Sequence, residues 1–132
     1  LIDVEKSSLV IRSLLINAVK YTNDNGYIHI QVKPIENLVA ISFTDSGIGI
    51  SEQDLSNIFT KFYRASNTSN YTSSGNGVGL ALVKALTEGQ GGKVSVKSKL
   101  GAGSTFTLEF PAPVEVIEPP LETLEDVKEH TV

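Results

Sequence analysis

Cysteine, methionine and tryptophan are all absent from this chain of 132 residues. Without cysteine the chain has no thiol nucleophile, no disulfide framework and no thiolate metal site, which fits a reducing compartment. No apolar run reaches the roughly 20 residues that a membrane-spanning helix requires, and no secretory signal opens the sequence. We therefore expect a cytoplasmic fragment of a longer protein, and the residues before Leu1 decide whether that protein is membrane-bound.

Excess charge of one sign is also missing from most of the chain. Residues 1–110 hold ten Lys and Arg against nine Asp and Glu, a net charge of +1. Residues 111–132 hold one Lys against six acids, a net charge of −5. The neutral body gives no support for the basic footprint that nucleic-acid binding requires.

The composition predicts one folded domain followed by a tail. Residues 1–111 are numerous enough to bury a core without a disulfide or a structural metal. Residues 112–132 are acidic and contain three of the prolines, so a solvated tail or linker is favoured over a docked helix.

A helix is predicted from Asp3, a typical N-cap residue, to about Thr22, where the Asn-Asp-Asn-Gly run at 23–26 ends it. Apolar residues at helical spacing form one stripe and polar residues form its neighbour. The apolar stripe is Ile11, Leu14, Leu15, Ala18 and Thr22, and the polar stripe is Ser13, Asn17, Lys20 and Asp24. Asn17 lies at the border, and on this helix alone the polar stripe is read as a solvated face.

Two antiparallel strands joined by a turn at 34–37 are predicted next. Between residues 27 and 33 the sequence alternates, which predicts Ile28, Ile30 and Val32 inward and His29 outward.

The returning strand, residues 38–45, carries a carboxylate at its end. Alternation places Asp45 on the same face as Val39, Ile41 and Phe43 if the strand persists. A carboxylate on a core face is costly unless it is hydrogen-bonded, and an amine-bearing ligand is one way to satisfy it. The alternative is an ordinary Asx turn at Asp45-Ser46-Gly47.

Ser51-Glu52-Gln53-Asp54 resembles a capping box, which opens a short helix towards Ile58. The aromatic residues Phe59, Phe62 and Tyr63 follow it.

Residues 65–76 are almost entirely Ser, Asn, Thr and Gly and are predicted to be mobile. The glycines of residues 75–80 lead into a helix that is apolar nearly all round and is therefore predicted to be buried. A glycine-rich entry into a helix N-terminus suits phosphate, although neither the P-loop nor the Rossmann fingerprint is present.

Strands are also predicted at 93–98 and at 104–110. The inner face of the second contains Phe106, Leu108 and Phe110. Ser104 has the same parity, so Ser104 and not Thr105 is expected to point inward beside Asp45, unless Ser104 only ends a turn.

Five motifs in this order resemble the catalytic, ATP-binding domain of sensor histidine kinases, in the superfamily shared with DNA gyrase, a heat-shock chaperone and mismatch-repair ATPases. They are similar to the N box (residues 14–22), the first glycine box (45–50), the F box (58–64), the second glycine box (75–80) and the last glycine box (101–106). The resemblance implies an α/β, or α+β, two-layer sandwich of the Bergerat type. Its sheet is mixed and mostly antiparallel, with about three helices on one face and a mobile ATP lid.

The resemblance also implies the site residues and the ligands ATP and Mg²⁺. Asp45 would accept a hydrogen bond from the adenine amine, with Ser104 helping through a water. Asn17 would hold Mg²⁺, and Arg64 would stabilise the outermost phosphate. The implied catalytic residues are Asn17, Lys20 and Arg64, and the implied nucleotide-binding residues are Asn17, Lys20, Tyr21, Asp45, Gly47, Gly49, Ile50, Phe59, Arg64, Gly75, Gly77, Val78, Gly79, Leu80, Ser104 and Thr105.

The implied activity is an ATP-dependent protein histidine kinase of two-component signalling. Its acceptor histidine would lie on an upstream dimerisation domain of the same protein, with a response regulator downstream, and neither His29 nor His130 is expected to be the acceptor. One departure bears on the chemistry: the ATPase relatives carry a glutamate base at the position of Ser13, and serine is a poor base near neutral pH. The alternative is a degenerate nucleotide-binding module that regulates without phosphotransfer.

Overall fold

Seven helices and strands follow one another in residues 3–61, 63 and 78–112, which are the residues that the computed structural model describes. They are α1 (Val4–Tyr21), β1 (Ile28–Ile35), β2 (Leu38–Asp45), α2 (Glu52–Leu55), α3 (Val78–Gly89), β3 (Lys93–Ser98) and β4 (Ser104–Pro111). This order confirms the predicted α/β class and every predicted element that lies in the described residues.

Helix α1 begins and ends where its sequence signals predict. The Asp3 side chain accepts a hydrogen bond from the backbone N–H of Lys6 at 3.1 Å, which satisfies one of the unpaired donors of the first turn. Val10, Leu14 and Ala18 face the core at helical spacing. The helix therefore places its last two turns, with the N-box residues, at a fixed end of the sheet.

The four strands lie in the order β1-β2-β4-β3 and every pair in the described sheet is antiparallel. The resemblance implied a mixed sheet, and the parallel pairing of such a sheet is not seen in these strands. In the register of β2 with β4, Asp45 is paired with Ser104 and Phe43 with Phe106.

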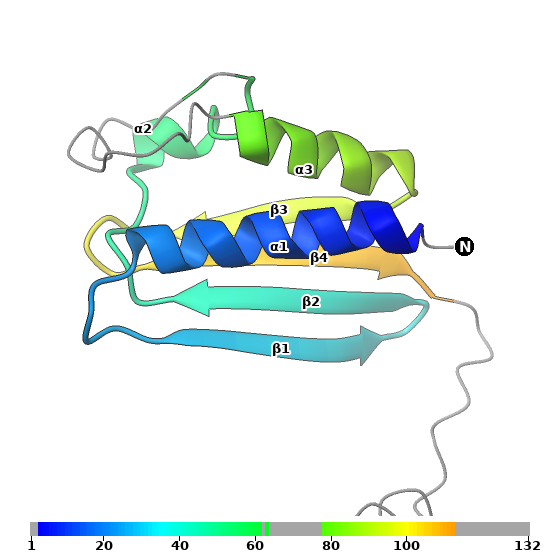
Figure 1. Cartoon of the computed structure of the whole chain (residues 1–132), viewed down its shortest axis with the longest axis horizontal. Coiled ribbons are helices and arrows are strands. Elements are labelled where there is room, and N and C mark those ends of the chain that lie inside the picture. Colours follow the sequence, from blue (N-terminus) through cyan, green and yellow to red (C-terminus); the bar gives the residue numbers. More distant parts are fainter. Residues whose placement is uncertain (1–2, 62, 64–77, 113–132) are drawn as a thin grey trace, which may run out of the picture.

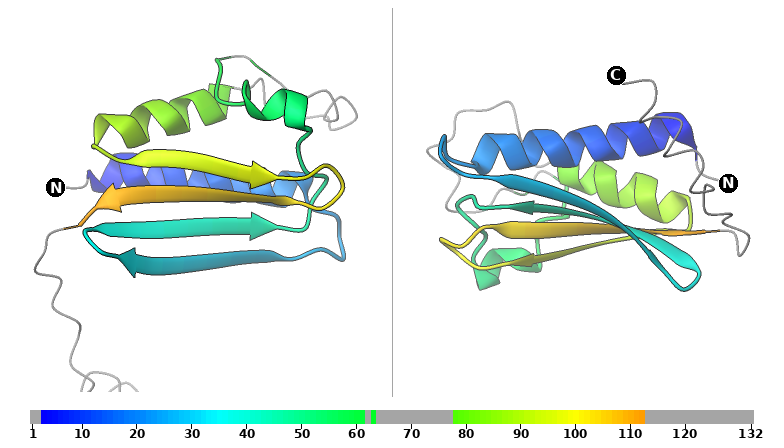
Figure 2. Two further views of the ribbon diagram at one scale, coloured as in Figure 1. Left: turned by 180° about the vertical axis from the view of Figure 1, so that it is seen from behind. Right: turned by 90° about the horizontal axis from the view of Figure 1, so that it is seen from below.

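Helices α1 and α3 cover one face of the sheet, as Figure 1 and the edge-on view of Figure 2 show. The short α2 lies beside β3, at the margin of the sheet, instead of completing a layer of three helices. The core between the helices and the sheet consists of Val10, Leu14, Phe43, Ile58, Val83, Phe106, Leu108 and Phe110. On the opposite face, hydroxyl pairs cross between β2 and β4: Ser42 with Thr107 at 3.4 Å and Thr44 with Thr105 at 3.0 Å.

The prediction for β1 is partly wrong. Ile30 and Val32 are 46% and 63% exposed, because β1 is the outermost strand and lies farthest from the two helices. The strand also continues through Pro34 to Ile35, which shortens the predicted turn to two residues. Proline is tolerated there because an outer strand leaves its N–H side without a partner strand.

The two later helices also differ from their predictions. Helix α2 ends at Leu55, and turns in place of helix connect it to Ile58. Helix α3 buries Val83 and Thr87, but Leu82 is exposed. The apolar character of α3 predicted burial all round, whereas the described residues pack against only one of its sides, through α1 and β3.

Candidate functional site

Asp45 lies on the core side at the end of β2, directly across from Ser104 at the start of β4. The Asp45 side chain is 5% exposed, and its Oδ1 accepts a hydrogen bond from the N–H of Gly47 at 2.9 Å. The strand therefore persists to Asp45, and the predicted placement of a buried carboxylate is confirmed. The bond to Gly47 is of the Asx type, so the inward-facing strand residue and the Asx turn, which the sequence offered as alternatives, are both present.

Burial raises the pKa of the Asp45 carboxyl above its ordinary value of 3.8, because the charged form loses hydration. The backbone N–H groups of Gly47 and Ser104 oppose this shift by donating to the carboxylate. A buried, hydrogen-bonded acceptor of this kind is suited to an uncharged donor group on a ligand.

The loop of residues 46–50, called the Asp45 loop below, is held by hydrogen bonds on both sides. On one side, Ile48 N–H donates to the carbonyl oxygen of Tyr21, in the last turn of α1, at 3.1 Å. On the other side, Ile50 N–H donates to Ser98 Oγ at 2.8 Å, and Gly101 N–H donates to the Ile48 carbonyl at 2.7 Å. Three of the sequence motifs, far apart in the chain, thus meet at one end of the sheet.

Gly47 and Gly49 are required by this loop itself. A Cβ on Gly47 would lie 2.3 Å from the Tyr21 carbonyl oxygen, and one on Gly49 would lie 2.1 Å from the Lys99 carbonyl oxygen. Gly49 also has a φ of +72°, which side chains rarely adopt. Close packing of backbone on backbone explains both glycines before any ligand is considered.

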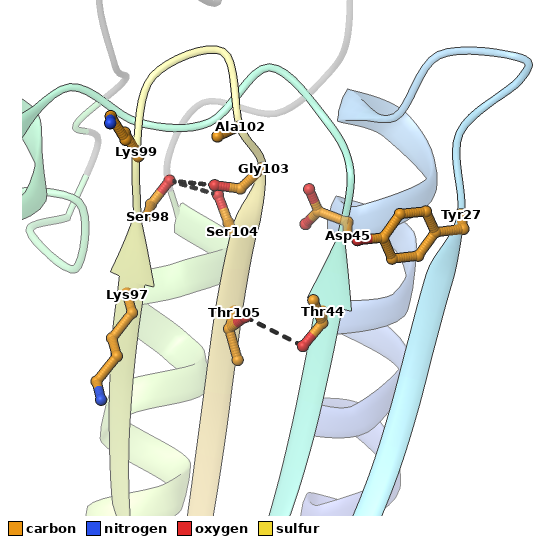
Figure 3. A pocket seen from close by; sticks show the side chains of 10 residues that line it. All are labelled: Tyr27, Thr44, Asp45, Lys97, Ser98, Lys99, Ala102, Gly103, Ser104 and Thr105. Carbon is orange, nitrogen blue, oxygen red and sulfur yellow. Dashed lines mark hydrogen bonds between the residues drawn. The ribbon is translucent and has the colours of Figure 1, made fainter.

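Ser98 connects the site residues, and the sequence analysis did not find it. Its hydroxyl donates to the Gly103 carbonyl oxygen at 2.8 Å, and its oxygen lies 2.8 Å from Ser104 Oγ (Figure 3). Since the single proton of Ser98 is used on Gly103, the Ser104 hydroxyl donates to Ser98 and keeps its own lone pairs for an acceptor role. The register pairs Ser98 with Ser104, so correct alignment of the β3–β4 hairpin was the available signal.

The N-box residues lie on the last two turns of α1. Asn17, Lys20 and Tyr21 are each partly buried, and Lys20 Nζ lies 5.1 Å from the centre of the Tyr21 ring. Because Tyr21 also holds the loop through its carbonyl, this end of α1 is beside the Asp45 loop.

The apolar site residues border the core. Phe59 meets Phe106 edge to face, with ring centres 6.3 Å apart, and Ile50 and Leu80 pack against the same core. The Thr105 side chain lies on the opposite face of the sheet from Ser104, bonded to Thr44.

The remaining predicted site residues are placed less fully. Val78 is the first residue of α3, and a Cβ on Gly79 would meet no atom of the described residues within 4 Å. Arg64, Gly75 and Gly77 lie outside the described residues, as do the predicted mobile segment 65–76 and the tail from residue 113.

A hollow of about 340 Å³ opens at the loop end of the sheet. It is lined by Tyr27, Thr44, Asp45, Lys97, Ser98, Lys99, Ala102, Gly103, Ser104 and Thr105 (Figure 3). Several of these belong to the helix-free face, and none of the N-box residues is among them. The candidate site is therefore defined by the meeting of α1, the Asp45 loop and the start of β4, on the helix side.

Within residues 3–61, 63 and 78–112, no group of three or more His, Asp or Glu side chains lies close enough to hold a metal ion. The helices in these ranges also include none with the length and apolar character of a membrane span.

Comparison with known proteins gives a consistent result. Residues 2–114 match the family described as histidine kinase-, DNA gyrase B-, and HSP90-like ATPase. Sensor histidine kinase RppB of Synechocystis is 34% identical over 102 residues, which are 77% of this chain and 22% of RppB.

Solved structures agree with the sequence match. The mycobacterial sensor histidine kinase MprB superposes with a TM-score of 0.75 at 26% identity, over 84% of this chain and 76% of that one. Full-length ShkA in complex with AMPPNP gives 0.67 at 30% identity, over 80% of this chain and 21% of that one. The chain spans about a fifth of the length of the curated relatives it matches.

Proposed function

The chain belongs to the family of histidine kinase-, DNA gyrase B- and HSP90-like ATPases, and from this premise we propose that it binds Mg-ATP and donates the γ-phosphoryl group to a histidine on a separate domain. The observation that supports the proposal most is the buried, hydrogen-bonded Asp45 at the meeting point of three motifs. The histidine-kinase relatives and the AMPPNP complex of ShkA favour a nucleotide as the ligand.

In this proposal the base half of the site recognises adenine. Asp45 accepts a hydrogen bond from the exocyclic amine, because a carboxylate that already holds backbone donors keeps capacity for one more. Ser104, whose hydroxyl donates to Ser98, accepts a hydrogen bond from a water between it and the base. Ile50, Phe59 and Leu80 supply apolar surface near the ring.

The phosphate half is assigned to α1 and to the glycine-rich entry of α3. Lys20 is a cation for the phosphates, Tyr21 lies against the nucleotide, and the N-terminus of α3 offers backbone N–H groups and the positive end of the helix dipole. The other phosphate-binding residues proposed are Arg64, Gly75, Gly77, Val78 and Gly79. Thr105 is not among them, because its side chain lies on the opposite face of the sheet from Ser104.

The residues present fit Mg²⁺ as the companion of the triphosphate. Mg²⁺ is usually held by one or two protein oxygens together with phosphate oxygens and waters, so a dedicated cluster of acids is not needed. The amide oxygen of Asn17, partly buried on α1, is the protein oxygen that we assign to it. The ion would supply charge neutralisation along the phosphates.

The chain's own contribution to phosphoryl transfer is positioning and fixed charge, which carry most of the catalysis in reactions of this class. The acceptor is placed on an upstream dimerisation domain of the same protein, and a response regulator receives the phosphoryl group later. We assign the catalytic domain to residues 1–111 and a tail or linker to residues 112–132. Neither nucleic acid nor a membrane surface is among the partners proposed for this stretch.

Ser13 favours transfer over hydrolysis. It occupies the α1 position where the ATPase relatives carry a general base, and a serine without a basic partner does not activate water near neutral pH.

The test is a transfer assay with the protein and its upstream histidine domain. Incubation with Mg-ATP is expected to label that histidine, with the label lost on its replacement by alanine. Binding of ATP without transfer would favour the second candidate, a regulatory module that has lost catalysis.

ATP affinity is expected to fall as the pH is lowered from neutrality through the raised pKa of Asp45, with an onset at a higher pH than for an exposed aspartate. The raised pKa of Asp45 means that the protonated form is reached earlier, and a protonated carboxyl is a poorer acceptor for an amine. Isothermal titration calorimetry across this range measures the effect. Asp45→Ala should remove this component, so an identical pH profile in the variant would contradict the assignment.

The pH dependence of the free energy of unfolding that Asp45 contributes has the opposite sign to that of an acid in a salt bridge. Since the folded-state pKa is raised, the empty fold binds the proton more tightly than the unfolded chain does. The contribution of Asp45 to the free energy of unfolding is therefore greatest below its unfolded pKa and is lost as the pH rises through the folded one.

A further inference from the structure

The hollow of about 340 Å³ at the loop end of the sheet is not used by the proposed function. Strand register gives it a row of side chains on the helix-free face. Thr44 of β2 is paired with Thr105 of β4, and Thr105 is paired with Lys97 of β3. Figure 3 shows Tyr27 on the β1 side of this row, and Lys99 just beyond the end of β3. The hollow is therefore bordered by two lysines on one side and by a tyrosine on the other, with hydroxyl groups between them.

The charge around the hollow is positive. Lys97 and Lys99 are exposed, and neither forms an ion pair within the residues that the structure describes. Asp45 is the acid in the lining, but its side chain is 5% exposed and its Oδ1 accepts a hydrogen bond from the Gly47 N–H. Two exposed ammonium groups thus face a single buried carboxylate, which favours an anionic ligand.

The hydroxyl groups supply donors for such a ligand. Thr44 Oγ1 and Thr105 Oγ1 lie 3.0 Å apart, so one hydroxyl donates to the other and the second proton of the pair is available to a ligand. Both threonines are partly exposed, and Tyr27, with its phenolic hydroxyl, is 62% exposed. Ammonium groups beside hydroxyl donors form a donor set that suits the oxygens of a phosphoryl group.

The backbone that carries these groups is held in place on both sides of the hollow. The Tyr27 N–H donates to Ser46 Oγ at 2.8 Å, and the Tyr27 carbonyl accepts from the Ser46 N–H at 3.1 Å. In the turn after β3, the Lys99 N–H donates to the Gly103 carbonyl at 3.3 Å, and the Ala102 N–H donates to the Lys99 carbonyl at 2.9 Å. Ligand binding therefore has to order side chains only, which limits its entropic cost.

We propose that this hollow is an anion site that binds a phosphoryl group between Lys97 and Lys99, with the threonine pair donating to it. Lys97 and the threonine hydroxyls lie on the face of the sheet away from α1 and α3, so the site is separate from the proposed nucleotide site. A volume of about 340 Å³ is large enough for an organic phosphate, since pockets for small organic molecules begin at about 300 Å³. The organic part of such a ligand lies against the Tyr27 ring.

The test uses inorganic phosphate and phenyl phosphate as probes on the full chain, at constant ionic strength and without nucleotide. Both are expected to shift the amide NMR signals of Thr44, Lys97 and Thr105 in the millimolar range. Phenyl phosphate should bind about threefold more tightly, because its ring contacts Tyr27. This result identifies a phosphate ester as the ligand, whereas equal affinities identify the free ion, and both support the site. If these signals do not shift, or if only signals at the end of α1 do, the inference is overturned.

Lys97→Gln and Lys93→Gln form a matched pair of variants. Each removes one positive charge from an exposed position on β3 and from the same face, but Lys93 lies across from Glu109 and outside the hollow. Lys97→Gln is expected to weaken both probes about fivefold, and Lys93→Gln should leave both affinities within twofold of wild type. Equal losses in the two variants would mean that the probes respond to the overall charge of this face, and the proposed site would be wrong. Melting temperatures recorded beside the titrations verify that both variants are folded.

Discussion

Asp45→Ala is expected to weaken ATP binding about five- to 150-fold, or about 1–3 kcal/mol, while the fold is retained. In the proposed binding mode, the variant removes the buried acceptor and leaves the adenine amine without a partner. The backbone N–H groups of Gly47 and Ser104 also lose their acceptor, so the loop that would hold adenine is less well ordered and binding is weakened further. Titration calorimetry with Mg-ATP measures the loss directly.

Ser42→Ala provides the comparison for Asp45→Ala. It is on the same strand and also removes a hydrogen-bonding group, but its partner is Thr107 on the helix-free face. ATP affinity should stay within twofold of wild type in this control. Unchanged affinity in a folded Asp45→Ala variant would remove Asp45 from base recognition and, with it, the main support for the proposed function.

Gly49→Ala is expected to cost roughly 2–5 kcal/mol of unfolding free energy, which is a large part of the stability of a domain this size. The left-handed backbone at this position accounts for about 1–2 kcal/mol. Overpacking adds a further 1–3 kcal/mol or so, because the new methyl group would lie 2.1 Å from a backbone oxygen that cannot rotate away. Thermal or urea unfolding of the empty protein measures the change.

Gly101→Ala separates the two causes. Gly101 has a φ of +82°, close to that of Gly49, but its added Cβ would meet no atom within 4 Å in the part of the chain that the structure describes. The control should therefore lose only the backbone part, about 1–2 kcal/mol. Equal losses in the two variants would show that the contact between the Asp45 loop and the Lys99 carbonyl is not tight, and the description of that loop as closely packed would be wrong.

The sequence was sufficient where one physical signal dominated. Asp3 and the apolar spacing of the first helix predicted α1, and strand alternation predicted that Asp45 and Ser104 face the core together. These signals are local or periodic, and at these positions the packing of the rest of the chain agrees with them. The order of the five motifs then predicted the family, which the match over residues 2–114 confirms.

Other features depend on neighbours that no local pattern specifies. Ile30 and Val32 alternate like core residues, but β1 lies at the margin of the sheet, beyond the helices that would cover it. Leu82 belongs to an apolar run, and only the packing of α3 decides which of its sides is covered. Ser98 became identifiable as a connecting residue only when the register of β3 with β4 was known.

The Asp45 loop is hydrogen-bonded to Tyr21 on one side and to Ser98 on the other, and this affects how a purine would bind. This part of the candidate site is ordered when the protein folds, so the entropic cost of ordering it is not paid again when a ligand binds. Adenosine alone should consequently dock with little rearrangement, and the empty and occupied forms should superimpose closely around the base.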